Sequence, residues 1–185
     1  MRWRYSKMSD KRLYFAYGSN INLTQMEYRC PAATPLMPVM LHGYELTFRG
    51  GGVATVIPNK DAVVPGLLWS ITPKCEKSLD HYEGFPNFYH KAGITVTDPE
   101  TGKIYYPMMY EMDERYRDPA LPSFSYFGGI AEGYRQNSMD TRPLYDALYK
   151  TEQQVDELYG KRMRESFFAQ EKPGSRKNKS RGRER

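Results

Sequence analysis

Two short segments of the sequence carry groups that could transfer a proton and bind an anion. The first is Leu79-Asp80-His81-Tyr82-Glu83-Gly84, in which Glu83 supplies a carboxyl group. Because Gly84 and Pro86 follow it, Glu83 is expected at the C-terminal end of a helix, where the helix dipole raises the pKa of a carboxyl group. Nearby aromatic rings would raise that pKa further by excluding water, and they belong to Tyr82, Phe85, Phe88 and Tyr89.

The second segment is Tyr17-Gly18-Ser19-Asn20, which follows a short apolar run. Consecutive backbone N–H groups in a Gly-Ser-Asn turn form a concave site for negative charge, and Gly18 is expected to permit the turn. The charge could be an oxyanion that develops during a reaction or a carboxylate of a substrate. The sequence does not decide between these two uses.

Each segment also has a simpler interpretation. A lone Glu-Gly pair is most often a helix end with a solvated carboxylate, and Gly-Ser-Asn is most often only a turn. His81 lies close to Glu83, but His42 and His90 show no spacing that completes a set of metal ligands, so no metal site is expected.

The elements that must position these residues follow from hydrophobic pattern and turn signals. A strand is predicted over 13–17 and a brief helix over 22–28. Thr72 and Pro73 begin a helix that runs to about Tyr82, with Gly84 as the left-handed residue that ends it. Further strands are predicted over 41–48, 54–57, 64–71, 94–97 and 103–110.

Further details of these elements are open to test. Pro65-Gly66 suggests an edge strand or a bulge in 64–71, and Gly50–Gly52 is a flexible break. Helices are predicted over 123–136 and 142–150, and Thr151–Gln154 reads as a capping box that opens a separate last helix. The apolar face of that helix is expected to pack on the sheet, through Val155, Leu158, Tyr159 and Met163.

The order and spacing of residues 14–20, residues 79–84 and Phe88-Tyr89 resemble the gamma-glutamylcyclotransferase and AIG2-like family. The hallmark of that family is a strand followed by Tyr-Gly-Ser-Asn and a downstream Leu-Asp-x-x-Glu-Gly. The similarity covers roughly residues 13–110 and continues more weakly to Tyr145. It implies an α+β fold, a small mixed, mostly antiparallel β-barrel or curled sheet of about six strands with flanking helices.

The resemblance also implies a reaction, in which the α-amine of a γ-glutamyl amino acid or amine attacks its own γ-carbonyl. The products are 5-oxoproline and a free amine, as in glutathione metabolism, and no cofactor is needed. Glu83 is then the general acid and base. Substrate-binding residues implied by the family pattern are Tyr17, Gly18, Ser19, Asn20, Tyr89 and Tyr126. The loops expected to select the leaving group are Gly50–Gly52, Phe85–Asn87 and Asp113–Pro122.

Composition sets the domain organisation. Residues 171–185 hold seven basic and two acidic side chains, so this segment carries the whole formal charge of +5. We expect an N-terminal extension (1–12), one domain (13–168) and a disordered basic tail (169–185). Two cysteines without a paired spacing, and the lack of a signal peptide or a membrane-spanning run, indicate a cytoplasmic protein with no membrane partner.

Two other functions are compatible with the sequence. The chain could be a non-catalytic module of the same fold that binds a small metabolite, or an interaction protein whose tail binds nucleic acid. Nucleic acid is an unlikely partner, because residues 1–170 carry no net charge. A homodimer is expected by family analogy.

Overall fold

The computed structural model describes residues 11–170, with side chains described through residue 163. Its centre is one seven-stranded sheet with the strand order β4-β7-β1-β3-β2-β5-β6. The strands are β1 (Arg12–Ala16), β2 (Thr34–Arg49), β3 (Val53–Ile71), β4 (Tyr89–Gly93), β5 (Val96–Thr97), β6 (Ile104–Tyr105) and β7 (Met108–Met112). The helices are α1 (Leu23–Arg29), α2 (Pro73–Tyr82), α3 (Phe124–Gln136) and α4 (Arg142–Gln170), with 3₁₀ turns η1 (Ser19–Ile21) and η2 (Glu114–Tyr116).

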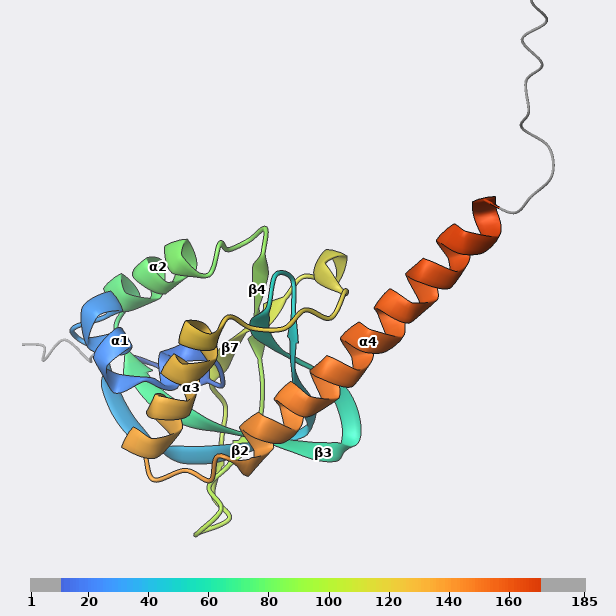
Figure 1. The fold of residues 1–185 in the computed structure, drawn as a ribbon. Helices are drawn as coiled ribbons and strands as arrows, with labels where there is room; N and C mark the ends of the chain where they lie inside the picture. Colours follow the sequence, from blue (N-terminus) through green and yellow to red (C-terminus); the bar gives the residue numbers. More distant parts are fainter. Residues whose placement is uncertain (1–10, 171–185) are drawn as a thin grey trace, which may run out of the picture.

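The sheet is mixed and mostly antiparallel, and it curls so that η1, α1, α2 and α3 gather on one side of it (Figure 1). β1 and β7 form its parallel pair, while β1–β3, β2–β3, β2–β5, β4–β7 and β5–β6 are antiparallel. This arrangement confirms the predicted fold class. The structure has seven strands instead of about six, because the predicted strand 103–110 is divided before Met108, residues 89–93 form a strand of their own, and the predicted strands 54–57 and 64–71 are joined in one.

The longest elements of the sheet are β2 and β3, which form one extended hairpin around Gly50–Gly52. The strands predicted over 54–57 and 64–71 are both parts of β3. The Pro65-Gly66 pair lies where the pairing of β3 with β1 stops, so β3 is central from Leu67 onward and has only β2 as a partner at the pair itself. Pro65 is tolerated there because the pairing of β3 with β1 ends at Leu67, so on that side its missing N–H removes no ladder hydrogen bond.

Local sequence signals set the limits of α2. Thr72 caps its first turn by accepting a hydrogen bond from the Cys75 N–H at 3.2 Å. Gly84 follows the helix with a φ of +64°, which is the left-handed conformation that ends helices. The predicted start and end of this helix are therefore confirmed, and Glu83 is its C-cap residue.

The predicted division of the last helical region is wrong. α4 is continuous from Arg142 through Gln170, and it passes the predicted domain boundary at residue 168. Thr151 caps no second helix, because it is fully buried and its hydroxyl donates to the Ala147 carbonyl at 2.8 Å. α4 contacts β2 and then extends away from the sheet (Figure 1). Tyr159 and Met163 are 69% and 65% exposed, so the predicted packing does not reach them.

Among the described residues, no helix is long and apolar enough to cross a membrane. The predicted extension 1–12 is described only from residue 11, and the predicted tail beyond residue 170 lies outside the described residues.

Candidate active site

A small cavity of about 30 Å³ opens where β1, η1, β3 and the end of α2 meet. Every site residue predicted from the sequence lines it. Three residues that the sequence analysis did not select line it as well, namely Tyr14, Ala54 and Tyr110. The full lining is Tyr14, Tyr17, Gly18, Ser19, Asn20, Ala54, Glu83, Tyr89, Tyr110 and Tyr126.

The end of α2 brings Glu83 to this cavity. Its backbone N–H still donates to the Leu79 carbonyl at 2.8 Å, and the left-handed Gly84 then turns the chain. The Phe85 N–H closes the helix end by donating to the Asp80 carbonyl at 2.9 Å. The Glu83 carboxylate is partly buried and accepts a hydrogen bond from Asn20 Nδ2, with 2.7 Å between Nδ2 and Oε1. Glu83 and the Tyr-Gly-Ser-Asn segment thus lie in direct contact.

The Asn20 side chain makes hydrogen bonds through both the nitrogen and the oxygen of its amide group. Its Nδ2 also donates to the Tyr14 hydroxyl at 2.8 Å, and its Oδ1 accepts from Arg29 Nη1 at 2.5 Å. Because a guanidinium group can only donate, Arg29 fixes which end of the amide faces Glu83. Arg29 Nη1 also donates to the Ser19 hydroxyl at 3.0 Å. The sequence analysis missed Arg29, whose only local signal is its place in the last turn of α1.

Burial raises the pKa of Glu83 to about 7, against the opposing effects of the Asn20 hydrogen bond and the Arg29 charge. The predicted direction agrees with this value, but the predicted aromatic surroundings are partly wrong. Tyr82 and Phe85 point outward and are 48% and 39% exposed. The rings that share the cavity with Glu83 are those of Tyr14, Tyr17, Tyr89, Tyr110 and Tyr126.

The tyrosine hydroxyls differ in what they can offer a ligand. Tyr17 donates to the Tyr110 carbonyl and Tyr89 to the Ala54 carbonyl, each at 2.6 Å, so both protons are committed to the backbone. The Tyr126 hydroxyl instead accepts from the Ala54 N–H at 3.1 Å, and no acceptor for its own proton is found among the described residues. Burial raises the pKa of Tyr126 to about 12, so it stays protonated and can donate into the cavity.

Backbone donors are available at the start of η1. The Ile21 N–H donates to the Gly18 carbonyl at 3.0 Å, which forms the turn, while no described residue accepts from the N–H of Ser19 or Asn20. Gly18 has a φ of −107°, so a left-handed conformation is not the reason for glycine there. The reason is space, because a Cβ on Gly18 would lie 3.2 Å from Ala54 Cβ and 3.5 Å from the Tyr126 hydroxyl.

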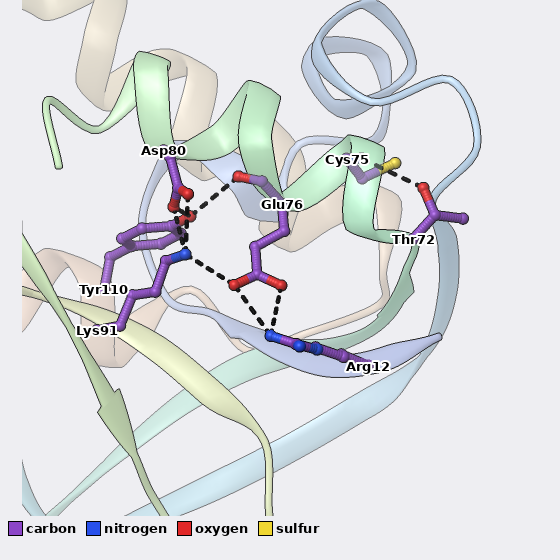
Figure 2. Close-up of polar contacts among 7 residues, drawn as sticks. All are labelled: Arg12, Thr72, Cys75, Glu76, Asp80, Lys91 and Tyr110. Carbon is purple, nitrogen blue, oxygen red and sulfur yellow. Dashed lines mark hydrogen bonds and ion pairs between the residues drawn. The ribbon is translucent and has the colours of Figure 1, made fainter. Parts of the chain in front are cut away.

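A network of charged side chains fixes α2 above the sheet (Figure 2). Lys91 on β4 bridges the carboxylates of Glu76 and Asp80, at 2.7 Å from each. The Tyr110 hydroxyl donates to Asp80 Oδ1 at 2.6 Å, and Arg12 on β1 pairs with Glu76 at 2.9 Å. These contacts tie the helix that ends at Glu83 to β1, β4 and β7. The sequence analysis did not detect this support.

The histidines do not join the site. His90 pairs with Asp113 at 2.6 Å, away from the cavity lining, and His42 and His81 are exposed. Within residues 11–170 no three or more His, Cys, Asp or Glu side chains are grouped as metal ligands would be.

Comparison with known proteins identifies the class to which this fold and cavity belong. The sequence model of the family "Gamma-glutamyl cyclotransferase, AIG2-like" matches residues 14–126. A gamma-glutamylcyclotransferase of Bos taurus is 29% identical over 145 residues, which cover 72% of this chain and 76% of that protein. The corresponding enzyme of Mus musculus is 30% identical over 138 residues, covering 69% and 72%.

Solved structures show a similar fold. The crystal structure of an uncharacterized human protein superimposes with a TM-score of 0.69 at 27% identity, over 75% of this chain and 87% of that one. A gamma-glutamyl cyclotransferase structure gives a TM-score of 0.64 at 24% identity, over 74% and 86%, and so supports the fold. The chain belongs to the gamma-glutamyl cyclotransferase, AIG2-like family and is an enzyme of that class, which confirms the resemblance seen in the sequence.

Proposed function

We propose that this enzyme cyclises the γ-glutamyl group of a γ-glutamyl amino acid or amine to 5-oxoproline, with Glu83 as general acid and base. The observation that supports it best is the position of the Glu83 carboxyl group. It has a pKa of about 7, lies in a cavity lined by tyrosines, and is hydrogen-bonded to the Asn20 amide. A group with this pKa can accept and release a proton at neutral pH.

The reaction proceeds through proton transfers at Glu83. Glu83 takes a proton from the substrate α-ammonium, and the free amine forms a bond to the γ-carbonyl carbon. The resulting tetrahedral intermediate carries an oxyanion and a protonated ring nitrogen. Glu83 then gives its proton to the leaving nitrogen while the bond between that nitrogen and the γ-carbon breaks and the carbonyl forms again. The ring nitrogen loses its second proton to the Glu83 carboxylate, which completes 5-oxoproline, and Glu83 passes this proton to the released amine. Because ring closure is intramolecular, holding the γ-glutamyl chain in a curled conformation supplies much of the rate enhancement.

Two groups of donors are available for the negative charges of the substrate. The N–H groups of Ser19 and Asn20 form one, and the Tyr126 hydroxyl forms the other. One would hold the oxyanion and the other the α-carboxylate, in either order. Tyr17 and Tyr89 would shape the pocket through their rings, since their hydroxyl protons are committed to carbonyl oxygens.

We also propose a cytoplasmic location, which is supported by the free thiols of Cys30 and Cys75.

The test is to incubate the purified protein with a panel of γ-glutamyl amino acids and amines and to measure 5-oxoproline. Glu83→Gln should lower kcat by at least about a hundredfold, because positioned acid-base groups contribute that much. Glu100→Gln, in the exposed turn between β5 and β6, is the matched control and should keep full activity. A folded Glu83→Gln protein with wild-type kcat would remove Glu83 from the mechanism.

A further inference from the structure

A second and larger cavity, of about 220 Å³, lies beside the candidate active site. It is built where β3, the end of β2 and the segment after β7 meet. None of its residues lines the first cavity, and the proposed cyclisation does not use any of them. The lining is Arg49, Thr55, Met112, Asp113, Glu114, Tyr116 and Arg117.

This cavity forms where the three predicted leaving-group loops meet. A Cβ on Gly50 would lie 3.1 Å from both Met112 Sδ and Tyr116 Cβ, so the Gly50–Gly52 turn packs directly on the segment after β7. Arg115 in that segment donates to the Asn87 carbonyl at 2.9 Å, which joins the Phe85–Asn87 loop to it. Of the loops predicted from sequence to choose the leaving group, Asp113–Pro122 lines the cavity, and the other two pack against this segment.

Among the described residues, the charges around the cavity leave one cation without a partner. Asp113 pairs with Arg115 at 2.8 Å and with His90 at 2.6 Å. Glu114 pairs with Arg117 at 2.6 Å. Arg49 makes no side-chain hydrogen bond or ion pair with any described residue. The lining thus offers one guanidinium group whose charge is not balanced locally.

Two buried polar atoms at the cavity also lack partners. Thr55 is 2% exposed, and its Oγ1 atom faces the Tyr17 hydroxyl without a hydrogen bond of regular geometry to any described group. The Nε atom of Arg49 is buried and unpaired in the same way. Buried polar groups without partners are uncommon and costly, and both atoms are closed off from the open part of the cavity, so a ligand gains affinity from them when the side chains that cover them shift.

A carboxylate meets these requirements better than water or phosphate. Water could hydrogen-bond to Thr55 but would not balance the charge of Arg49. A phosphate dianion would bring excess negative charge close to Asp113 and Glu114. A carboxylate carries a single charge, and its oxygens can accept from both a guanidinium group and a hydroxyl group.

The two cavities share a wall. Ala54 lines the first and Thr55, the next residue of β3, lines the second, so their Cα atoms are only about 4 Å apart. On the other strand, Tyr110 lines the first cavity and Met112 the second. Met112 pairs with Tyr89, whose hydroxyl donates to the Ala54 carbonyl. A substrate whose γ-carbonyl lies near Glu83 can therefore place its leaving group toward Arg49.

We propose that Arg49 and Thr55 form a carboxylate site that holds the leaving amino acid of the substrate. The proposal rests on the cyclisation proposed above and narrows its substrates to γ-glutamyl compounds whose leaving group carries a carboxylate. Arg49 and Thr55 are then specificity-determining residues that bind the part of the substrate remote from the reacting atoms.

The experiment compares γ-glutamyl-L-alanine with γ-glutamyl-ethylamide, which has the same leaving group without the carboxylate. Arg49→Gln should lower kcat/KM for the alanine compound by about 10- to 100-fold, mainly through KM, as expected for loss of a charge-assisted hydrogen bond. The same variant should change kcat/KM for the ethylamide by less than about threefold. Arg49→Lys should recover part of the loss, because it restores the charge without the planar guanidinium group.

Two further variants keep the result interpretable. Thr55→Val has nearly the same shape without the hydroxyl, and it should lower kcat/KM for the alanine compound by about three- to tenfold. Arg142→Gln at the start of α4 removes an exposed arginine far along the chain and should change neither substrate. Circular dichroism checks that each variant is folded.

A direct binding measurement separates failure of this proposal from failure of the cyclisation. N-acetyl-L-alanine should raise the melting temperature of the wild-type protein but not of Arg49→Gln, and N-acetyl-L-alaninamide should raise neither. If no γ-glutamyl compound yields 5-oxoproline but this pattern holds, the cyclisation fails and the carboxylate site stands. Equal losses on both substrates in Arg49→Gln, or equal effects of the two acetyl compounds, would overturn the carboxylate site.

Discussion

The pKa of Glu83 results from competition between burial and two compensating neighbours. Burial disfavours the carboxylate and is the largest effect, while the Asn20 amide and the Arg29 charge favour it. The outcome of about 7 places the group in the range where it can serve as both base and acid. Complete burial without Asn20 and Arg29 would keep the group protonated and unable to accept a proton at neutral pH.

The raised pKa of Glu83 predicts how stability depends on pH. The folded protein holds the Glu83 proton up to pH about 7, whereas the unfolded chain loses it near the ordinary value of 4.5. The stability contributed by this group is therefore fully present below pH 4.5 and is lost as pH rises through about 7. Glu83→Gln removes this loss and should be more stable than wild type at pH 8, by up to about 3 kcal/mol.

Urea denaturation of both proteins at pH 4 and pH 8 measures this effect. The advantage of Glu83→Gln should be small at pH 4 and large at pH 8. An advantage of the same size at both pH values would show that the Glu83 pKa is not raised in the folded protein.

Arg29 predicts a shift in the pH profile of the reaction. Its positive charge lowers the pKa of Glu83 and its guanidinium group orients the Asn20 amide, so Arg29→Gln should raise that pKa. The acidic limb of the kcat/KM profile, expected near pH 7 in wild type, should then move to higher pH. Arg29→Lys keeps the charge and should shift the limb less. A lower rate with an unshifted limb would mean that Arg29 has only a structural role.

At the scale of elements, α2 links the sheet to the candidate active site. Its polar side is held by Lys91, Tyr110 and Arg12, and its C-terminal end carries Glu83 into the cavity (Figure 2). A small rotation of this helix would move the Glu83 carboxylate away from Asn20. We therefore expect the network to position Glu83 as well as to stabilise α2, because α2 ends at a carboxylate that lies 2.7 Å from its hydrogen-bond donor.

Lys91→Met tests this support. The substitution leaves the carboxylates of Glu76 and Asp80 without their shared cation, and it should lower the free energy of unfolding by about 1–3 kcal/mol. It should also lower kcat more than it raises KM, because α2 then holds Glu83 less firmly. Lys77→Met, on the exposed side of the same helix, is the control for urea denaturation and kinetics. Indistinguishable behaviour of the two variants would contradict the positioning role.

At the scale of the whole molecule, the residues that carry the net charge and the residues that line the candidate active site lie in different parts of the chain. Residues 1–170 carry no net charge, and the formal charge of +5 belongs to residues 171–185. The candidate site lies entirely between Tyr14 and Tyr126. We therefore expect the basic tail to have no part in the proposed reaction, and the predicted homodimer stays a prediction that light scattering would test.

Deleting residues 172–185 should leave the rate of 5-oxoproline formation unchanged within about twofold, since such a segment lacks apolar residues that could pack on the domain. Any binding to RNA or DNA should weaken steeply with added salt in the full-length protein and disappear in the truncated one. Nucleic-acid binding that survives the deletion would place the basic surface elsewhere in the chain.

The sequence by itself was sufficient for features that depend on neighbours in the chain. Thr72 and Gly84 set the limits of α2 through hydrogen bonds and a backbone conformation within one helical turn. The family motif brought together the residues that line the candidate site, from Tyr17 to Tyr126, and gave the fold class. Strand limits were less well predicted, because a long strand such as β3 depends on partners in β1 and β2.

Only the tertiary structure decided which distant residues meet. Arg29 donates a hydrogen bond to Asn20, Lys91 bridges Glu76 and Asp80, and Arg49, which has no ion-pair partner among the described residues, shares a cavity with Thr55. Thr151 reads as a helix cap from its neighbours, but it is buried against β2, where its hydroxyl lies 3.4 Å from that of Thr47. The physical reason is that ion pairing, burial and pKa depend on contacts between segments far apart in the chain. Local helix and strand propensities do not determine those contacts.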